Sequence, residues 1–348
     1  MGEPDRERVR RQLLGWYREK KRDLPFRRTR DPYAILVAEI ILQRTRVRAG
    51  LPYYERFLAA FPTVHALAAA SEPDVMRAWE GLGFYRRAKN LHQAAKMIVN
   101  DHGGAIPAEY EALRALPGIG DYTAGAVGSI AFGLHIPAVD GNAIRVLSRV
   151  FRVEGDVFHG PGKRRIQELA SDLVDADAPG TWNQAVMELG ATVCVPRAPK
   201  CERCPIAEDC MAFAAGVQGE IPRTTVKPEV PIVPVVFAVV QRAGKVLLVR
   251  RREGLHEGLY GLPGGEVRGG ETPEVAIRRH LAELGLSPLA VAPASPLRHA
   301  FSHLRWEGNV YRCEATGRPR GAEWVDAHEL VQRPLIPLHR RLIDRAVS

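Results

Sequence analysis

The stretch Leu-Pro-Gly-Ile-Gly-Asp-Tyr-Thr-Ala, residues 116–124, places a proline and two glycines directly before an apolar helical segment. Glycine lets the backbone approach a partner closely, and the free N–H groups at the start of a helix are donors for phosphate oxygens. Gly118 and Gly120 are therefore candidate contacts to a phosphate backbone. Taken alone the pattern is equally typical of a plain turn between two helices, so its meaning depends on the rest of the chain.

A group of four cysteines follows the turn, with intervals of six, two and five residues: Cys194, Cys201, Cys204 and Cys210. Thiolates held by short loops bind either Zn²⁺ or an iron–sulfur cluster, and the spacing does not choose between them. The same loop contains three cations that either meet phosphates or are simply solvated: Arg197, Lys200 and Arg203. The fifth cysteine, Cys313, falls in a predicted strand and is expected to be a core residue.

The periodicity of the apolar residues divides the chain. It predicts an all-α domain over residues 1–214, with a hairpin at about 113–132 and the cysteine loop at 194–210. Residues 215–230 have the composition of a linker. Residues 231–348 then alternate strands with a helix, which predicts an α+β domain. The expected fold is therefore multidomain.

The composition of the 348 residues limits the classes of function. A hydrophobic fraction of 46% argues against wholesale disorder, and no apolar run is long enough to cross a membrane. The charged N-terminal segment has no secretory signal, so we expect a cytoplasmic protein. The net charge of +9 is compatible with a polyanionic partner, although this excess alone is weak evidence.

Two carboxylates stand out. Glu39 lies in a segment, residues 34–42, that is apolar on nearly every side, so burial should raise its pKa and let it act as a general acid. A buried salt bridge is the alternative. Asp140 precedes a helix as an N-cap, and the backbone N–H groups and helix dipole should lower its pKa. Opposite shifts would suit an acid and a stabiliser of positive charge, the pair that cleavage of a glycosidic bond requires.

The order of these motifs resembles that of the A/G-specific adenine DNA glycosylase family. The cysteine loop is similar to the [4Fe–4S] loop of the endonuclease III family, and residues 116–124 look like its helix-hairpin-helix, which grips the DNA backbone. The segments around Glu39 and Asp140 resemble the two catalytic segments of the adenine glycosylases. The resemblance implies a [4Fe–4S] cluster held by the four cysteines.

The resemblance also assigns roles to residues. Glu39 would be the acid and Asp140 the stabiliser of the sugar cation, with Tyr122 and Asn142 in support. Bifunctional members of the superfamily place a lysine nucleophile where this chain has Tyr122, so a monofunctional glycosylase is implied. Local packing of the Tyr122 ring is the alternative interpretation.

Further contacts to DNA are implied at two places. Gly-Leu-Gly-Phe-Tyr at residues 81–85 resembles the wedge loop of the family, so Phe84 or Tyr85 would stack into the opened helix. Gln43 would lie beside the lesion. Arg44 stands where the family usually has a second glutamine, and in this respect the chain leans toward related glycosylases that remove thymine or uracil opposite guanine.

The second domain resembles a Nudix domain with an incomplete metal site. Gly265, Glu271 and Arg279 fit the opening of a Nudix box, but His280 and Leu284 stand where further box positions are wanted. Glu283 remains as a lone acid, so we expect the fold without the pyrophosphatase activity.

The remaining motif of the second domain is His-Ala-Phe-Ser-His at residues 299–303. It looks like the loop with which adenine glycosylases sense 8-oxoguanine opposite adenine. Ser302 would hydrogen-bond to the altered Hoogsteen edge of the oxidised base, and Phe301 and His303 would pack beside it.

The sequence as a whole predicts a monofunctional adenine glycosylase that acts as a monomer on double-stranded DNA containing A·8-oxoguanine or A·G mispairs. We expect it in the cytoplasm, associated with the nucleoid when bound to DNA. The alternatives are a thymine or uracil glycosylase acting at guanine mismatches and a non-catalytic lesion-binding protein.

Overall fold

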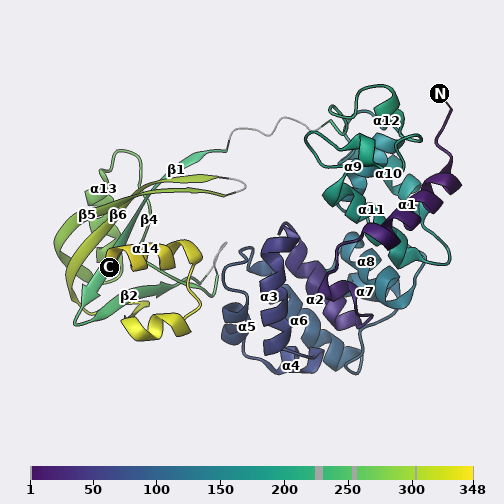
Figure 1. Ribbon diagram of the computed structural model, residues 1–348. Coiled ribbons are helices and arrows are strands. Elements are labelled where there is room, and N and C mark those ends of the chain that lie inside the picture. Colours follow the sequence, from purple (N-terminus) through teal and green to yellow (C-terminus); the bar gives the residue numbers. More distant parts are fainter. Residues whose placement is uncertain (1, 224–229, 253–256, 302–303, 348) are drawn as a thin grey trace. The chain divides into compact units, whose positions relative to one another are not determined.

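The computed structural model describes residues 2–223, 230–252, 257–301 and 304–347 (Figure 1). Its contacts separate two compact units. The first consists of Met1–Ala69 and Asn90–Val226, and the second of Ala70–Lys89 and Lys227–Ser348. Each unit is described by itself below.

The first unit is built from helices. In chain order they are α1 (Arg6–Lys20), α2 (Pro32–Leu42), α3 (Val47–Ala60), α4 (Val64–Ala69), most of α6 (Arg86–Asp101), α7 (Tyr110–Ala115), α8 (Asp121–Phe132), α9 (Gly141–Val150), α10 (Gly160–Leu173), α11 (Pro179–Thr192) and α12 (Met211–Ala214). Two short 3₁₀ turns, Pro25–Arg27 and Cys201–Arg203, are interspersed among them. All of these elements fall within the segment predicted to be helical.

Helix α2 is the most deeply buried of the helices that carry the site. It starts with Pro32 in its first turn and with the Asp31 side chain accepting from the N–H of Tyr33 at 3.0 Å, a combination favoured at helix N-termini. Every residue from Tyr33 to Ile41 is buried. The helix packs against α3 and α8, so its one carboxylate, Glu39, is enclosed by apolar neighbours.

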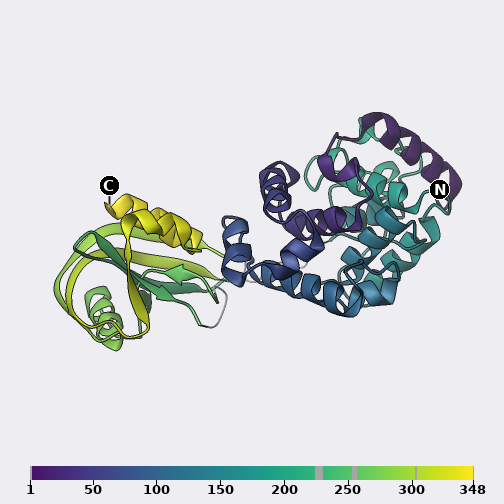
Figure 2. The ribbon, with the colours of Figure 1, turned by 90° about the horizontal axis from the view of Figure 1, so that it is seen from below.

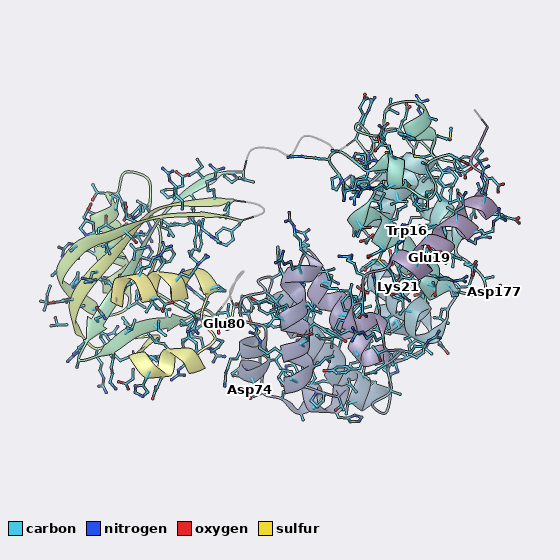
Figure 3. The ribbon with its side chains drawn as sticks, viewed as in Figure 1. Trp16, Glu19, Lys21, Asp74, Glu80 and Asp177 are labelled. Atoms are coloured by element: carbon cyan, nitrogen blue, oxygen red, sulfur yellow. The ribbon has the colours of Figure 1, made fainter. Side chains whose placement is uncertain are left out.

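A second group of helices packs around α9 (Gly141–Val150), which follows Asp140. Helix α11 contacts α1, α8 and α9, and the apolar faces of α1, α9, α10 and α11 share one core. Trp16 on α1 packs partly buried against this core, whereas Glu19 and Lys21 near the end of α1 are exposed (Figure 3). Helix α11 therefore connects the N-terminal segment with the helix that begins at Asp140.

The second unit contains α5 (Glu72–Ala78) and a seven-stranded sheet. The strands are β1 (Ile232–Arg242), β2 (Lys245–Arg250), β3 (Tyr260–Gly261), β4 (Gly264–Glu266), β5 (Leu286–Ala300), β6 (Arg305–Gly317) and β7 (Ala322–Asp326). Their order is β3-β2-β1-β6-β5, with β4 paired to β1 and β7 paired to β2. The pair β1–β6 is parallel and the other pairs are antiparallel.

The sheet is covered on both faces by helices, α13 (Pro273–Glu283) on one and α14 (Pro337–Val347) on the other (Figure 2). Strand β1 shows why. Val236 and Ala238 join the core that includes Ile277 of α13, while the ring of Phe237 lies 4.5 Å from the ring of His339 in α14. Successive side chains of a strand point to opposite faces, so a strand buried on both faces is apolar throughout. None of the helices formed by described residues is long and apolar enough to span a membrane.

Candidate active site

Glu39 occupies an apolar site with one close polar partner. Its side chain comes from α2 and is 8% exposed, and the phenol of Tyr122 donates to its Oε2 at 2.5 Å. Burial raises the pKa of Glu39 to about 7; the nearby charge of Asp140 raises it further, whereas the Tyr122 hydrogen bond and the charge of Arg27 lower it. The raised pKa expected from the sequence is confirmed, and the carboxyl can hold a proton near neutral pH.

Tyr122 lies in the first turn of α8, and its hydroxyl points toward the acid rather than toward local packing partners. Besides Glu39, the hydroxyl lies 3.4 Å from Sδ of Met187 on α11. Burial, followed by the neighbouring carboxylates, raises the pKa of Tyr122 well above its usual value. The phenol therefore remains protonated and acts as a donor to Glu39.

Asp140 is the N-cap of α9, as predicted. Its Oδ1 accepts from the N–H of Ala143 at 2.7 Å, and its Oδ2 accepts from Nδ2 of Asn142 at 2.7 Å. The predicted downward pKa shift is wrong, however. Burial raises the pKa of Asp140, and the hydrogen bonds and the charge of Arg145 only counteract this. The two carboxylates are thus shifted in the same direction, because the sequence reveals the cap but not the depth of the site.

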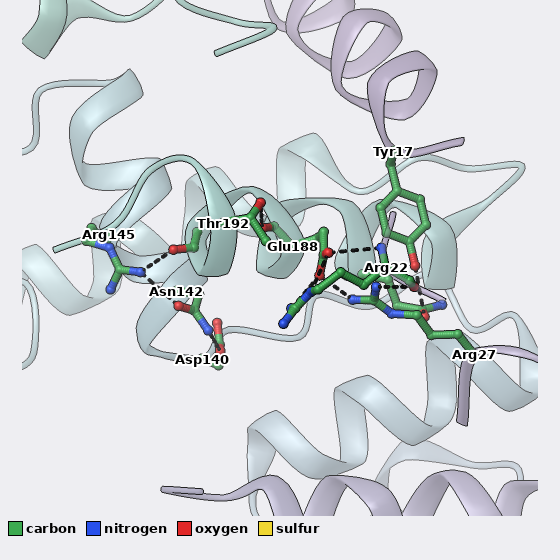
Figure 4. A network of polar contacts seen from close by, with 10 residues as sticks. Tyr17, Arg22, Arg27, Asp140, Asn142, Arg145, Glu188 and Thr192 are labelled. Atoms are coloured by element: carbon green, nitrogen blue, oxygen red, sulfur yellow. Dashed lines mark hydrogen bonds and ion pairs between the residues drawn. The ribbon is translucent and has the colours of Figure 1, made fainter. Parts of the chain in front are cut away.

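A chain of hydrogen bonds connects Asp140 through Asn142 to Arg145 (Figure 4), and Arg145 continues it to the cysteine loop. Asn142 accepts at Oδ1 from Arg145 at 2.8 Å. Arg145 also donates to the carbonyl of Gly190 at 2.7 Å and, through Nε, to the carbonyl of Cys194 at 2.7 Å. The side chain that caps α9 is therefore oriented by groups at the end of α11 and at the first cysteine. This role of Arg145 was not predicted from the sequence.

A buried ionic group also escaped sequence analysis. Glu188 of α11 is 1% exposed, and Arg22 donates to both of its carboxylate oxygens at 2.7 Å while Arg27 donates to Oε2 at 2.7 Å (Figure 4). Although burial raises the pKa of Glu188, these hydrogen bonds dominate and lower it to about 2. The group fixes Arg27, whose charge acts on Glu39. Residues so far apart in sequence carry no pattern that would have revealed their pairing.

Two predicted lesion-side residues follow α2. Gln43 is half-buried and donates through Nε2 to Oγ1 of Thr123 at 3.1 Å. Arg44 is exposed, and its backbone adopts the left-handed conformation with φ of 58°. Gln43 is thus linked to the helix that carries Tyr122, while Arg44 lies on the surface where the chain turns away from α2.

The turn between α7 and α8 is shaped as its sequence predicts. Gly118 has φ of +78°, and a Cβ there would lie 2.6 Å from Cβ of Asn90. Gly120 is the N-cap of α8, is exposed and has open space around it. Gly118 is required by the turn itself, whereas Gly120 leaves the start of the helix accessible to a partner.

The four cysteines surround a single cavity, together with Arg149 of α9 and apolar residues that include Val146 and Leu189. Arg149 is 2% exposed and donates to Sγ of Cys194 at 3.3 Å and to the carbonyl of Val195 at 2.8 Å. No three described His, Cys, Asp or Glu side chains form a group suited to one metal ion. Four thiols around an apolar cavity, with a buried cation beside them, fit a multi-iron cluster bound by thiolates. The three cations of the loop are exposed: Arg197, Lys200 and Arg203.

The two aromatic candidates of the wedge loop, residues 81–85, differ in how far their side chains are exposed. Phe84 is 45% exposed, whereas Tyr85 is 4% exposed. The Tyr85 hydroxyl accepts from the N–H of Gly81 at 3.5 Å and so closes the loop from inside. Only Phe84 presents its ring to a partner.

The predicted lesion-sensing loop is described only in part. The ring of Phe301 packs edge-on against His299 at 4.5 Å and against Trp306 at 4.8 Å. Ser302 and His303 lie outside the described residues.

The Nudix-like box contains ion pairs centred on Arg279. Arg279 donates to Glu271 at 2.7 Å through Nε and to Glu283 at 3.2 Å through an Nη atom, so both acids are engaged by one arginine. His280 lies 3.1 Å from the carbonyl of Glu266.

Comparison with known proteins agrees with this architecture. Residues 37–176 match the HhH-GPD superfamily of base excision DNA repair proteins, residues 194–210 the iron–sulfur binding domain of endonuclease III, and residues 235–345 the NUDIX domain. The cysteines at 194, 201, 204 and 210 are thus the ligands of a [4Fe–4S] cluster site, which the cavity fits. The helical unit therefore has the fold of the HhH-GPD superfamily of base excision DNA repair proteins.

The relatives narrow this class. An adenine DNA glycosylase of Mycolicibacterium smegmatis is 40% identical over 59% of this chain and 69% of its own length. That of Rattus norvegicus is 42% identical over 64% of this chain, which spans only 45% of the rat protein. A solved thermostable thymine-DNA glycosylase has a TM-score of 0.55 and 31% identity, covering 60% of this chain and 97% of its own. The chain belongs to the adenine DNA glycosylase family.

The raised pKa of Glu39 predicts a stability cost. The native pKa is about 7 and the ordinary value is 4.5, so native-state stability is highest below pH 4.5 and is lost as the pH rises through 7. The shift corresponds to about 3 kcal/mol. We expect Glu39→Gln to raise the free energy of unfolding at pH 8 by up to that amount, with little gain at pH 4. Urea unfolding at both pH values measures this, with exposed Glu55→Gln as the control; equal gains at both pH values would contradict it.

Arg149 is predicted to be necessary for the cysteine cavity. Replacing it by methionine removes the donor to Cys194 Sγ and leaves buried carbonyls without a partner, which should destabilise the first unit by about 3 kcal/mol. We expect Arg149→Met to contain less iron per chain and to unfold at lower temperature. Arg152→Met, at an exposed residue of the same region, is the control. Wild-type iron content and stability in Arg149→Met would refute the assignment.

Proposed function

We propose that this chain is a monofunctional DNA glycosylase that hydrolyses the N-glycosidic bond of adenine mispaired with 8-oxoguanine and with guanine. The observation that carries the proposal is the buried Glu39 carboxyl, held by Tyr122, with a pKa of about 7 and with Asp140 close enough for its charge to act on it. Membership of the adenine DNA glycosylase family supports the choice of base.

The first step is departure of the base. Protonated Glu39 donates its proton to N7 of an adenine that has left the base stack, and the bond between C1′ and N9 breaks with its electron pair going to the base. Because N7 is protonated, the base departs as neutral adenine and not as an anion, which makes it a better leaving group. The Tyr122 phenol holds the Glu39 carboxyl in place and stabilises the carboxylate that remains after proton transfer.

Loss of the base leaves positive charge on the sugar. Ionised Asp140 stabilises this oxocarbenium character, and its orientation is fixed by the N–H of Ala143 and by Asn142. Water then adds to C1′, and the Glu39 carboxylate takes the proton that the water loses. The Glu39 carboxyl is thereby reprotonated, so one turnover consumes one water and releases adenine.

The reaction ends with hydrolysis because Tyr122 occupies the position of the lysine nucleophile of bifunctional relatives. A phenol has no amine nitrogen and so cannot form a Schiff base with the sugar, and no strand cleavage by lyase chemistry is expected from this position. The enzyme would leave an abasic site in intact DNA.

Three surfaces of the chain support DNA binding. Accessible backbone at Gly118 and Gly120 precedes α8, whose N-terminal N–H groups suit a phosphate. The exposed cations of the cysteine loop provide further positive charge for phosphate groups. The [4Fe–4S] cluster, when bound, would supply the structural cross-link that holds that loop. Phe84 is the side chain that would enter the base stack, and Gln43 and Arg44 would lie near the mispair.

The second unit would provide recognition of the oxidised base. We infer that the loop of residues 299–303 reads 8-oxoguanine, with Phe301 packed on Trp306 as its fixed side and Ser302 and His303 as contacts to the base. The Nudix-like box would have a structural role, because Arg279 engages both Glu271 and Glu283.

A second candidate is removal of thymine or uracil opposite guanine. It is favoured by Arg44 and by the likeness to the thermostable thymine-DNA glycosylase. A protonated acid helps a purine leave through N7, whereas thymine has no such site, so the Glu39 environment favours adenine. If the chain only bound lesions and did not cleave them, the raised pKa of Glu39 would serve no function.

Single-turnover excision on four duplexes tests the proposal. We expect base release from A·8-oxoguanine and A·G duplexes and little from T·G and U·G duplexes. Glu39→Gln should lower the adenine excision rate by about 10²–10⁴-fold, the usual contribution of a general acid. Faster release of thymine than of adenine would favour the second candidate, and full activity of Glu39→Gln would remove the assignment of the acid.

The pH dependence of adenine excision provides an independent check. The reaction needs protonated Glu39, so the single-turnover rate should fall about tenfold per pH unit above the pKa of about 7. Tyr122→Phe removes the hydrogen bond that lowers this pKa and should move the break to higher pH. A rate that rises from pH 6 to pH 9 would be incompatible with Glu39 as the acid.

A further inference from the structure

The wedge loop contains a stack of three side chains that its proposed role as a DNA contact does not use. Trp79 is fully buried, and the guanidinium carbon of Arg87 lies 5.3 Å from the centroid of its ring. The same carbon lies 5.5 Å from the ring centroid of Phe84. Both distances are within the range of cation–π attraction. Arg87 therefore contacts both a buried ring and an exposed one.

The backbone of the loop is tied to the same two residues. The carbonyl of Gly83 accepts from Nε1 of Trp79 at 3.1 Å and from Arg87 at 3.3 Å. The N–H of Arg87 donates to the carbonyl of Phe84 at 2.9 Å. Arg87 thus fixes the residue before Phe84 through its side chain and Phe84 itself through its backbone.

Phe84 needs such support because its conformation is unfavourable in two respects. Its ring is 45% exposed although burial of a phenylalanine is favoured, and its φ is +48°, which side-chain-bearing residues adopt at a cost. Gly83, the preceding residue, also has a left-handed backbone, with φ of +70°, and no atom packs where its side chain would lie.

We propose that Arg87 is the positioning residue for Phe84, holding its ring outward before DNA is bound. The inference rests on the proposed function, in which Phe84 enters the base stack. If the loop is already ordered before DNA binds, the entropy lost by ordering it does not add to the cost of distorting the duplex. Arg87 then affects extrusion of the target base, while bond cleavage in an extruded base remains the work of the Glu39 site.

Stopped-flow fluorescence of 2-aminopurine, placed beside the target adenine, separates these steps in the full-length, iron-loaded protein. We expect Arg87→Met to slow the fluorescence rise, and excision from the paired A·8-oxoguanine duplex, by about tenfold. Excision from a duplex in which the adenine is already unpaired should be unchanged. Arg87→Lys, which keeps the charge but not the planar stack, should show most of the loss. Arg86→Met, at the exposed neighbouring arginine, is the matched control.

A double-mutant cycle decides whether Arg87 acts through Phe84. Phe84→Ala should slow extrusion, and adding Arg87→Met should slow it no further. Additive effects, equal behaviour of Arg87→Met and Arg86→Met, or an equal loss on the unpaired substrate would each overturn the proposal. If Arg87→Met does not fold, Arg87→Lys provides the same comparison. The fluorescence change reports DNA distortion whether or not adenine is released, so failure of the proposed activity is distinguished from failure of this inference.

Discussion

The site depends on the hydrogen bond between the Tyr122 phenol and the Glu39 carboxyl inside an apolar enclosure. Burial alone would make the carboxyl a weak acid that retains its proton; the phenol offsets part of this effect and brings the pKa to about 7. Packing of α2 against α8 brings the two groups together. The same burial that makes the acid useful lowers the stability of the native state above neutral pH, a compromise common at catalytic sites.

Helix α9 connects the second carboxylate with the cysteine loop. Its first turn is capped by Asp140, and two arginines four residues apart, Arg145 and Arg149, bind Cys194 through its carbonyl and its Sγ. Because α9 is bonded to Asp140 at its start and to Cys194 further along, the position of the cysteine loop affects the position of the Asp140 carboxylate. The cysteine loop therefore contributes to the geometry of the site although none of its cysteines contacts Glu39 or Asp140 in the described contacts.

Much of this could be predicted from the chain. Local signals gave the helices around residues 34–42 and 116–132, the N-cap at Asp140 and the grouping of the cysteines, because caps, turns and apolar periodicity depend on neighbours in sequence. The direction of the Asp140 pKa was predicted wrongly. Its cap is a local feature, but the burial that outweighs the cap is produced by helices distant in sequence.

The sequence by itself determined the type of each element, the acid in its apolar helix and the four thiols that the cluster requires. Only the tertiary structure decided which groups meet: Arg22 and Arg27 on Glu188, Arg149 on Cys194, and Phe84 rather than Tyr85 on the surface. The physical reason is the separation along the chain over which each kind of interaction acts. Helix and turn preferences act over a few residues, whereas desolvation and ion pairing depend on side chains that come together only when the chain has folded.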